Sequence, residues 1–249
     1  MKKCLLLCVM AVFLIILCSS IYATDITIPT TFGQNELKNF AKELGGALAY
    51  RQYQPAKPLG LTGFDVGIQV NANPIKSKDI WDKVMANDAP DMLPVPMVFV
   101  KKGLPLNIDL GIRGLPIPGT NITLMGGNLK YSILEGTVAT PAVGISVDYS
   151  QVSGSDDFDL NVMTVNASVS KGFAIITPYA GVASDQINMK IKNDLLKNPP
   201  AGTGLKDEKA SATRLFAGLK LSPLPLLAIT AEVNMADVTS YGIALGVGF

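Results

Sequence analysis

Residues 238–249 read Val-Thr-Ser-Tyr-Gly-Ile-Ala-Leu-Gly-Val-Gly-Phe, and this stretch decides the fold. Every second position from Tyr241 to Phe249 is large and apolar, whereas the positions between them are glycine or alanine. Successive side chains of a β-strand point to opposite faces, so this strand has one bulky apolar face and one nearly bare face. A soluble strand would carry polar residues on its exposed face. The pattern instead predicts a strand of a closed barrel that turns hydrocarbon outward to lipid and leaves room inside.

The same stretch resembles the end of bacterial outer-membrane β-barrels, which typically finish on a strand of alternating apolar and aromatic residues with a terminal Phe. Phe249 is the last residue here. The resemblance implies an outer-membrane location, with two partners: the lipid of that membrane, and the barrel-assembly machinery, which reads the strand ending at Phe249.

Period-two alternation recurs along the chain and predicts about ten strands. Tight connections alternate with longer or more polar ones, as periplasmic turns alternate with external loops in such barrels. The predicted fold class is therefore all-β, a closed antiparallel transmembrane barrel with one N-terminal amphipathic helix. The strands are expected at about 62–72, 95–100, 106–115, 122–134, 142–151, 158–170, 174–191, 212–221, 227–234 and 238–249.

Three details of these strands are more specific predictions. The apolar residues of 158–170 change face part-way along, which predicts a bulge near Val162. Gly126-Gly127 predicts a second bend or bulge. In the strand at 174–191 we expect Ile187, Met189 and Ile191 to point outward, and Gln186, Asn188 and Lys190 inward.

The first 23 residues predict a secretory signal peptide. Lys2 and Lys3 precede an apolar run at 4–18, and small residues lead to a cleavage site after Ala23. That run is shorter than the ~20 residues that a membrane anchor needs. All three cysteines precede the site, so the mature chain is expected to have no disulfide and no thiolate. Residues 24–60 then form a helical segment, and residues 61–249 form the barrel.

The helical segment has one apolar face. The spacing predicts a helix of about four turns from Asn35, which Pro55 and Pro58 prevent from continuing. Two placements stay open: a periplasmic or interfacial helix beside the barrel, or a plug that enters the lumen. The residues of the candidate plug face are Leu37, Phe40, Leu44 and Leu48.

Histidine is absent from the chain, and this excludes much catalytic chemistry. A Ser-His-Asp triad is impossible, and the commonest metal ligand is missing. Asp65 and Asp148 could form a carboxylate pair, but we expect hydrogen-bonded structural roles for them and not a catalytic one. We therefore expect no enzyme activity, no metal and no cofactor. Lys and Arg number 21 against 20 acids, and signal cleavage would leave 19 against 20, so nucleic acid is not an expected partner.

The inward face of the predicted barrel carries charges of both signs. Arg214 and Glu232 lie on neighbouring strands, and so do Lys130 and the Asp109/Arg113 pair. Mixed neighbours favour salt bridges that occlude the lumen, and a ten-stranded barrel is narrow, so no large aqueous channel is expected. The candidate lumen-lining or ligand residues are Asp65, Asp109, Arg113, Lys130, Asp148, Arg214, Phe216, Lys220 and Glu232.

Three functions remain open. The layout is similar to that of outer-membrane transporters for hydrophobic compounds, in which an N-terminal hatch plugs the lumen. This resemblance implies a narrow or plugged channel for small ligands, hydrophobic ones included. The second is a structural or adhesive barrel that displays its external loops. The third, a soluble secreted β carrier, is disfavoured by the many outward apolar faces.

Overall fold

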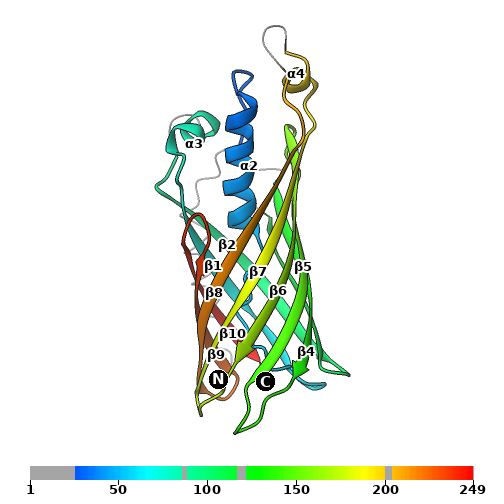
Figure 1. Ribbon diagram of the computed structural model, residues 1–249, viewed down its shortest axis with the longest axis vertical. Helices are drawn as coiled ribbons and strands as arrows, with labels where there is room; N and C mark the ends of the chain where they lie inside the picture. The colour runs from blue at the N-terminus through cyan, green and yellow to red at the C-terminus, as the bar shows by residue number, and fades with distance from the viewer. Residues whose placement is uncertain (1–25, 86–88, 117–121, 200–203, 249) are drawn as a thin grey trace, which may run out of the picture.

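Ten antiparallel strands close into a barrel in the computed structural model, which describes residues 26–85, 89–116, 122–199 and 204–248 (Figure 1). Each strand pairs with its sequence neighbours, and β1 closes on β10 from the Asp65–Gly248 pair to the Ala72–Tyr241 pair. The predicted fold class is confirmed. The predicted signal peptide, its cleavage after Ala23 and Phe249 lie outside the described residues. The elements are α2 (Gln34–Leu48), β1 (Phe64–Pro74), α3 (Lys78–Val84), β2 (Met92–Leu104), β3 (Ile108–Pro116), β4 (Thr123–Leu134), β5 (Ala142–Ser153), β6 (Phe158–Ser170), β7 (Ile176–Ile191), α4 (Asp194–Lys197), β8 (Glu208–Leu224), β9 (Leu227–Met235) and β10 (Ser240–Gly248).

The barrel has two different ends. The end with the short hairpins, such as 105–107 and 225–226, is called here the turn end, and β10 also finishes there (Figure 1). The opposite end, called the loop end, carries α2, α3 and α4 (Figure 1). The predicted alternation of tight and longer connections holds for most of the chain, but the turn-end connection 135–141 is longer than the loop-end connections 154–157 and 236–239. No helix in the described ranges is long and apolar enough to span a bilayer.

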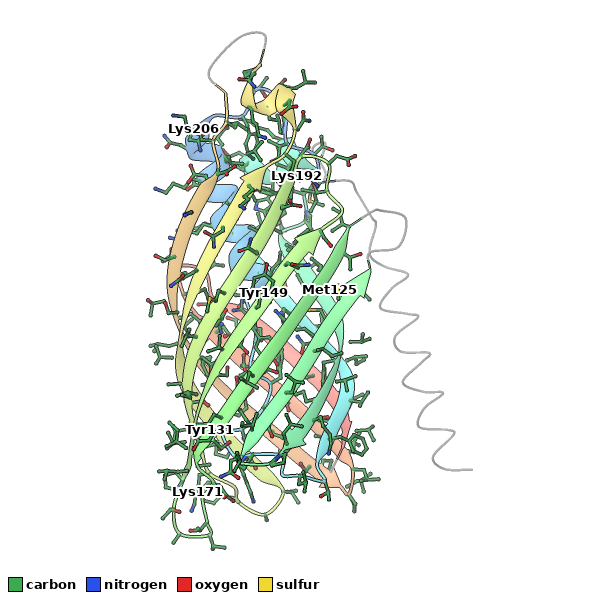
Figure 2. All side chains as sticks on the ribbon, turned by 90° about the vertical axis from the view of Figure 1, so that its right-hand side faces the viewer. Met125, Tyr131, Tyr149, Lys171, Lys192 and Lys206 are labelled. Carbon is green, nitrogen blue, oxygen red and sulfur yellow. The ribbon has the colours of Figure 1, made fainter. Side chains whose placement is uncertain are left out.

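The outer wall is apolar over its middle and its turn-end part. Figure 2 shows Met125, Tyr131 and Tyr149 pointing away from the barrel, and these side chains are 47–54% exposed. Leu129 and Val147, on the same outer face, are 50% and 47% exposed. The labelled lysines lie at the two ends, Lys171 at the turn end and Lys192 and Lys206 at the loop end (Figure 2). A predominantly apolar wall of this kind is typical of a barrel that faces lipid.

Helix α2 lies inside the barrel at the loop end. Its Phe40 ring contacts Phe158 of β6 and Trp81 of α3, with centroids 6.0 and 5.1 Å away. Gly45 lies so close to β7 that an added Cβ would come within 2.5 Å of Ile187. Of the two placements that the sequence left open, the structure shows the one inside the lumen. The four residues of the plug face, each no more than 4% exposed, are Leu37, Phe40, Leu44 and Leu48.

The position of α2 overturns the predicted faces of β7. Ile187, Met189 and Ile191 point inward and are 0–3% exposed, whereas Gln186 and Lys190 are exposed on the outer face. The prediction was wrong because it took every large apolar side to face lipid. At the loop end, the apolar surface that these side chains meet is the helix.

Both predicted bulges are also absent from the positions where they were expected. Strand β6 alternates regularly from Phe158 to Ser170, and its pairing with β5 and β7 has no register shift at Val162. What changes along β6 is the kind of residue on each face. In β4 the pairing is regular at Gly126-Gly127, and the register shift falls between Ser132 and Leu134.

Candidate functional site

The lumen below α2 is filled by residues 49–59, called here the strap. The strap leaves α2 at Ala49 and runs toward the turn end, where Leu59 precedes the start of β1. Residues 49–56 are all buried. Tyr53 has a φ of +38°, a conformation that a non-glycine residue holds only when its surroundings fix it.

Basic side chains of the wall hold the strap by its backbone. They come from four strands (β2, β3, β4 and β8), and each donates to one or two carbonyl oxygens of the strap or of the last residue of α2. Hydrogen bonds from charged donors are about twice as strong as neutral ones, and here they satisfy carbonyls that have no sheet partner. In order along the chain, the bonds are Arg113 Nη2 to Leu48 O (2.8 Å), Arg214 Nη2 to Tyr50 O (2.7 Å), Lys101 Nζ to Gln52 O (3.1 Å), and Lys130 Nζ to Pro55 O and Lys57 O (both 2.9 Å).

Acidic side chains of the wall accept from the same segment. The Tyr53 amide donates to Glu232 Oε2 at 3.0 Å, and the Leu59 amide donates to Asp109 Oδ1 at 3.0 Å. Gln54 Nε2 also donates to Asp109, at 2.7 Å. Wall groups of both signs are therefore directed at one extended peptide, and each sign meets the backbone group that complements it.

The bare face of β10 makes room for the strap. A Cβ added to Gly242 would lie 1.5 Å from the Tyr53 hydroxyl, which donates to Asn71 of β1. The sequence predicted space on this inner face without saying what fills it. The ring of Tyr53 fills it.

The structure places the nine predicted lumen residues on the inner face. Eight are at most 5% exposed, and the ninth, Lys220, lies nearer the turn end with its Nζ 3.9 Å from Asp65 Oδ2. Asp109 and Lys130 are directly paired at 2.9 Å. Arg214, however, pairs with Asp185 at 2.9 Å, and among the described residues no ion pair joins it to Glu232. The register explains this, because Glu232 lies opposite Gly218, four residues along β8 from Arg214.

Other predicted residues have structural partners. Phe216 packs against Tyr179 with ring centroids 6.4 Å apart. Asp148 accepts from Ser146 at 2.8 Å and from Asn166 at 2.9 Å, and it does not contact Asp65. In the described part of the chain, no group of three metal-binding side chains gathers.

Sequence reasoning missed the strap itself. Arg51, Gln52, Tyr53 and Gln54 form a polar run between an amphipathic helix and the first strand, which reads as an ordinary linker. One signal could have found the strap: the predicted lumen has more inward charges than pairs within the wall can neutralise. Sequence reasoning also missed Asp185, which accepts hydrogen bonds from Arg214 at 2.9 Å and from Thr164 at 2.7 Å.

The wall and strap together define a small barrel of the outer-membrane type whose lumen is closed by its own N-terminal segment. The chain belongs to a family of unknown function, DUF6588, whose model matches residues 83–249. That match begins in α3 and therefore excludes α2, the strap and β1. No curated protein matches the chain in sequence.

Solved structures with a similar fold are small transmembrane barrels. A de novo designed transmembrane β-barrel matches with 13% identity over 80% of this chain and 100% of its own, with a TM-score of 0.34. The N-terminal barrel domain of Pseudomonas aeruginosa OprF matches with 13% identity over 76% of this chain and 99% of its own, again at 0.34. Neisserial surface protein A matches with 11% identity over 75% and 96%, at 0.34. At this level of likeness, nothing about the function of those proteins transfers to this chain.

Proposed function

We propose that the protein is an integral outer-membrane barrel that acts as a plugged channel for small polar solutes and has no enzyme activity. Its partners are the membrane lipid around the apolar wall and the barrel-assembly machinery, through the strand that ends at Phe249. The uncharged outer face around Leu129 and Val147 supports the membrane location and opposes a soluble carrier.

The observation that supports the channel proposal is the set of hydrogen bonds from wall side chains to the backbone of the plug. Many small barrels fill their lumen with wall side chains, but here Lys101, Arg113 and Lys130 bind the backbone of an N-terminal segment that is not part of the wall. If the strap leaves, these cations and acids such as Asp109 and Glu232 line a polar passage that water can enter.

This lining narrows the class of solute. Hydrophobic ligands were left open by the sequence, because Phe40, Leu44, Leu48 and Phe216 offered apolar contacts. In the structure these side chains are already packed in apolar clusters. The wall residues that would be exposed if the strap left the lumen are polar. Small polar solutes therefore fit better than hydrophobic ones.

A disulfide that locks the plug tests the channel. Position 45 on α2 and position 187 on β7 are in contact, so a Gly45→Cys/Ile187→Cys pair brings two thiols within bonding range. In planar bilayers we expect a low conductance that reduction raises, and a constitutively higher conductance when residues 26–58 are deleted. The single Ile187→Cys variant is the control and should not respond to reductant.

Negligible conductance from the folded deletion variant would contradict the channel. Retention of fold is checked by the gel shift between boiled and unboiled samples.

A second function, surface display, has one observation in its favour. The start of α2 and the residues before it bind two loops at the loop end: Ile28 N donates to Asp157 Oδ2 at 2.8 Å, and Gln34 Nε2, from the first residue of α2, donates to Lys206 O at 3.0 Å. Such ties make a firm external surface, which an adhesive barrel needs. The disulfide variant separates the two functions, because the plug of a display barrel stays docked and reduction leaves its conductance low, whereas deletion of residues 26–58 opens the lumen in either case.

A further inference from the structure

A cavity of about 260 Å³ lies at the loop end, between α2 and the wall. Its sides come from the last turns of α2, the end of β1, the start of the inward face of β8, and the connection from β9 to β10. A space of this size accommodates a small organic molecule, since one water needs only about 10–15 Å³ on such a measure. Neither the strap contacts nor the proposed channel accounts for it.

Most charges around the cavity are already matched. Arg214 pairs with Asp185 at 2.9 Å, and Lys42 pairs with Asp237. Glu43 accepts three hydrogen bonds: from Trp81 Nε1 at 2.9 Å, Ser77 N at 3.1 Å and Lys76 N at 3.3 Å.

Among the buried charges that line the cavity, Arg51 is the exception. It lines the cavity and is 4% exposed, yet no carboxylate of the described residues pairs with it. Its Nη2 donates to Gly46 O at 2.9 Å and Ser240 Oγ at 3.0 Å, and reaches Asn73 Oδ1 at 3.4 Å. Its Nη1 has no hydrogen-bond partner in the described structure. A buried guanidinium that is held only by neutral acceptors would be stabilised by an anion in the cavity beside it.

We propose that this cavity binds a small organic carboxylate, with the carboxylate on Arg51 and an apolar body against Ala47, Pro74 and Val238. A monoanion fits better than a phosphate, because Asp185 and Glu43 also line the cavity and would repel a second negative charge. The apolar walls favour a ligand with a hydrocarbon part. This site is independent of the proposed channel, because it needs only the docked plug.

Binding is tested on the folded full-length protein in detergent, with 3-fluorobenzoate as the probe and fluorine NMR as the readout. We expect a saturable shift for 3-fluorobenzoate and none for the neutral 3-fluorobenzamide. Inorganic phosphate at tenfold higher concentration should fail to displace the carboxylate. Equal binding of the amide, or displacement by phosphate, would refute the assigned ligand class.

Variants assign the binding to this cavity. Arg51→Gln should weaken 3-fluorobenzoate about tenfold or more, since it removes a charge-assisted bond to a buried anion. Val238→Trp fills the cavity from the β9–β10 connection while Arg51 is kept, and should also weaken binding, which covers the case in which Arg51→Gln loosens the strap. The control is Lys78→Gln, a cation outside the cavity that pairs with Asp91. Unchanged affinity in both Arg51→Gln and Val238→Trp, or a loss in Lys78→Gln as large as theirs, would overturn the site, whatever the conductance experiment finds.

Discussion

The loop-end part of strands such as β6 and the rest of the barrel differ in which face is apolar: the inner face at the loop end, and the outer face elsewhere. Along β6, Phe158, Leu160 and Val162 point inward to α2, while Asp159 and Asn161 point outward. Farther along the same strand the faces exchange character: the inward residues become Thr164, Asn166, Ser168 and Ser170, and the outward ones become Met163, Val165, Ala167 and Val169. One regular strand therefore passes from a soluble type of core into a wall that faces lipid.

The two regions also hold the N-terminal segment in different ways. At the loop end α2 is held by apolar packing around Phe40, whereas the strap below it is held by hydrogen bonds from Arg214, Lys101 and Lys130. Apolar packing is strong and non-directional, while the strap bonds depend on alignment of each carbonyl with its donor. The difference suggests that the helix anchors the plug and the strap sets its position in the lumen.

The largest effect is expected in the apolar core of the loop end. Phe40→Ala should destabilise the docked helix by about 3–5 kcal/mol, because it removes a fully buried ring and leaves a cavity. Lys38→Ala, on the exposed side of the same helix, is the matched control. Amide hydrogen exchange of residues 34–48 is the measurement. Unchanged protection in Phe40→Ala would mean that the strap, and not the apolar core, holds the helix.

A charge placed on the outer face should separate the two regions directly. Val147→Lys puts an ammonium among Leu129, Ile145 and Val165 on the apolar wall, and should cost about 2–4 kcal/mol in vesicles. Gln186→Lys, on the outer face of the loop-end region, should change stability by less than about 0.5 kcal/mol. Urea titration of vesicle-inserted protein gives both values. Similar costs at the two positions would contradict the idea that lipid contacts the apolar part of the wall and not the loop-end region.

A smaller effect is expected where the strap meets the bare face of β10. Gly242→Ala forces Tyr53 to move and should weaken strap docking by about 1–3 kcal/mol, the usual range for overpacking. Gly127→Ala is the control, since its added Cβ meets only Gly111 O at 3.7 Å. Hydrogen exchange at residues 50–54 reports the difference. Equal protection in both variants would show that Tyr53 does not depend on the space at Gly242.

The sequence predicted the barrel because its main signal is local. Alternation such as Ile145, Val147 and Tyr149 against Ser146 and Asp148 follows from strand geometry and from lipid outside, and it needs no knowledge of distant residues. Predicted lumen residues such as Asp109 and Lys130 point inward for the same reason.

The errors have one physical cause, which is that a single strand does not say what its apolar face meets. Ile187 and Met189 were assigned to lipid, and the change of face near Val162 was read as a bulge, because the helix that packs inside was not placed. The partners of the lumen charges were missed for the same reason. Arg214 bonds Tyr50 O and Asp185, which lie near it only in the folded barrel, and the spacing of residues along the chain does not reveal this. Alternation fixes the direction of a side chain, while its environment depends on the whole fold.

The smallest expected effect concerns the start of α2, at the loop end. Glu36 accepts from the Gly33 amide at 2.8 Å and from Lys83 Nζ at 2.5 Å, and these contacts lower the pKa of the carboxyl below its ordinary value of 4.5. A carboxyl with a lowered folded pKa stabilises the fold above the unfolded value, and this contribution is lost as the pH falls through the folded pKa. Docking of α2 should therefore weaken below about pH 4.5, by no more than about 1 kcal/mol because the pair is partly exposed.

Glu36→Gln should remove this acid-dependent part while leaving docking at pH 7 slightly weaker, and Glu135→Gln, at the turn end, should leave it unchanged. Hydrogen exchange at 34–48 between pH 3 and 7, corrected for the intrinsic rate, measures it. If Glu36→Gln keeps the full acid dependence, the contacts of Glu36 with Gly33 and Lys83 do not cause it. The test thus decides whether these contacts at the start of α2 control how firmly the plug is anchored at low pH.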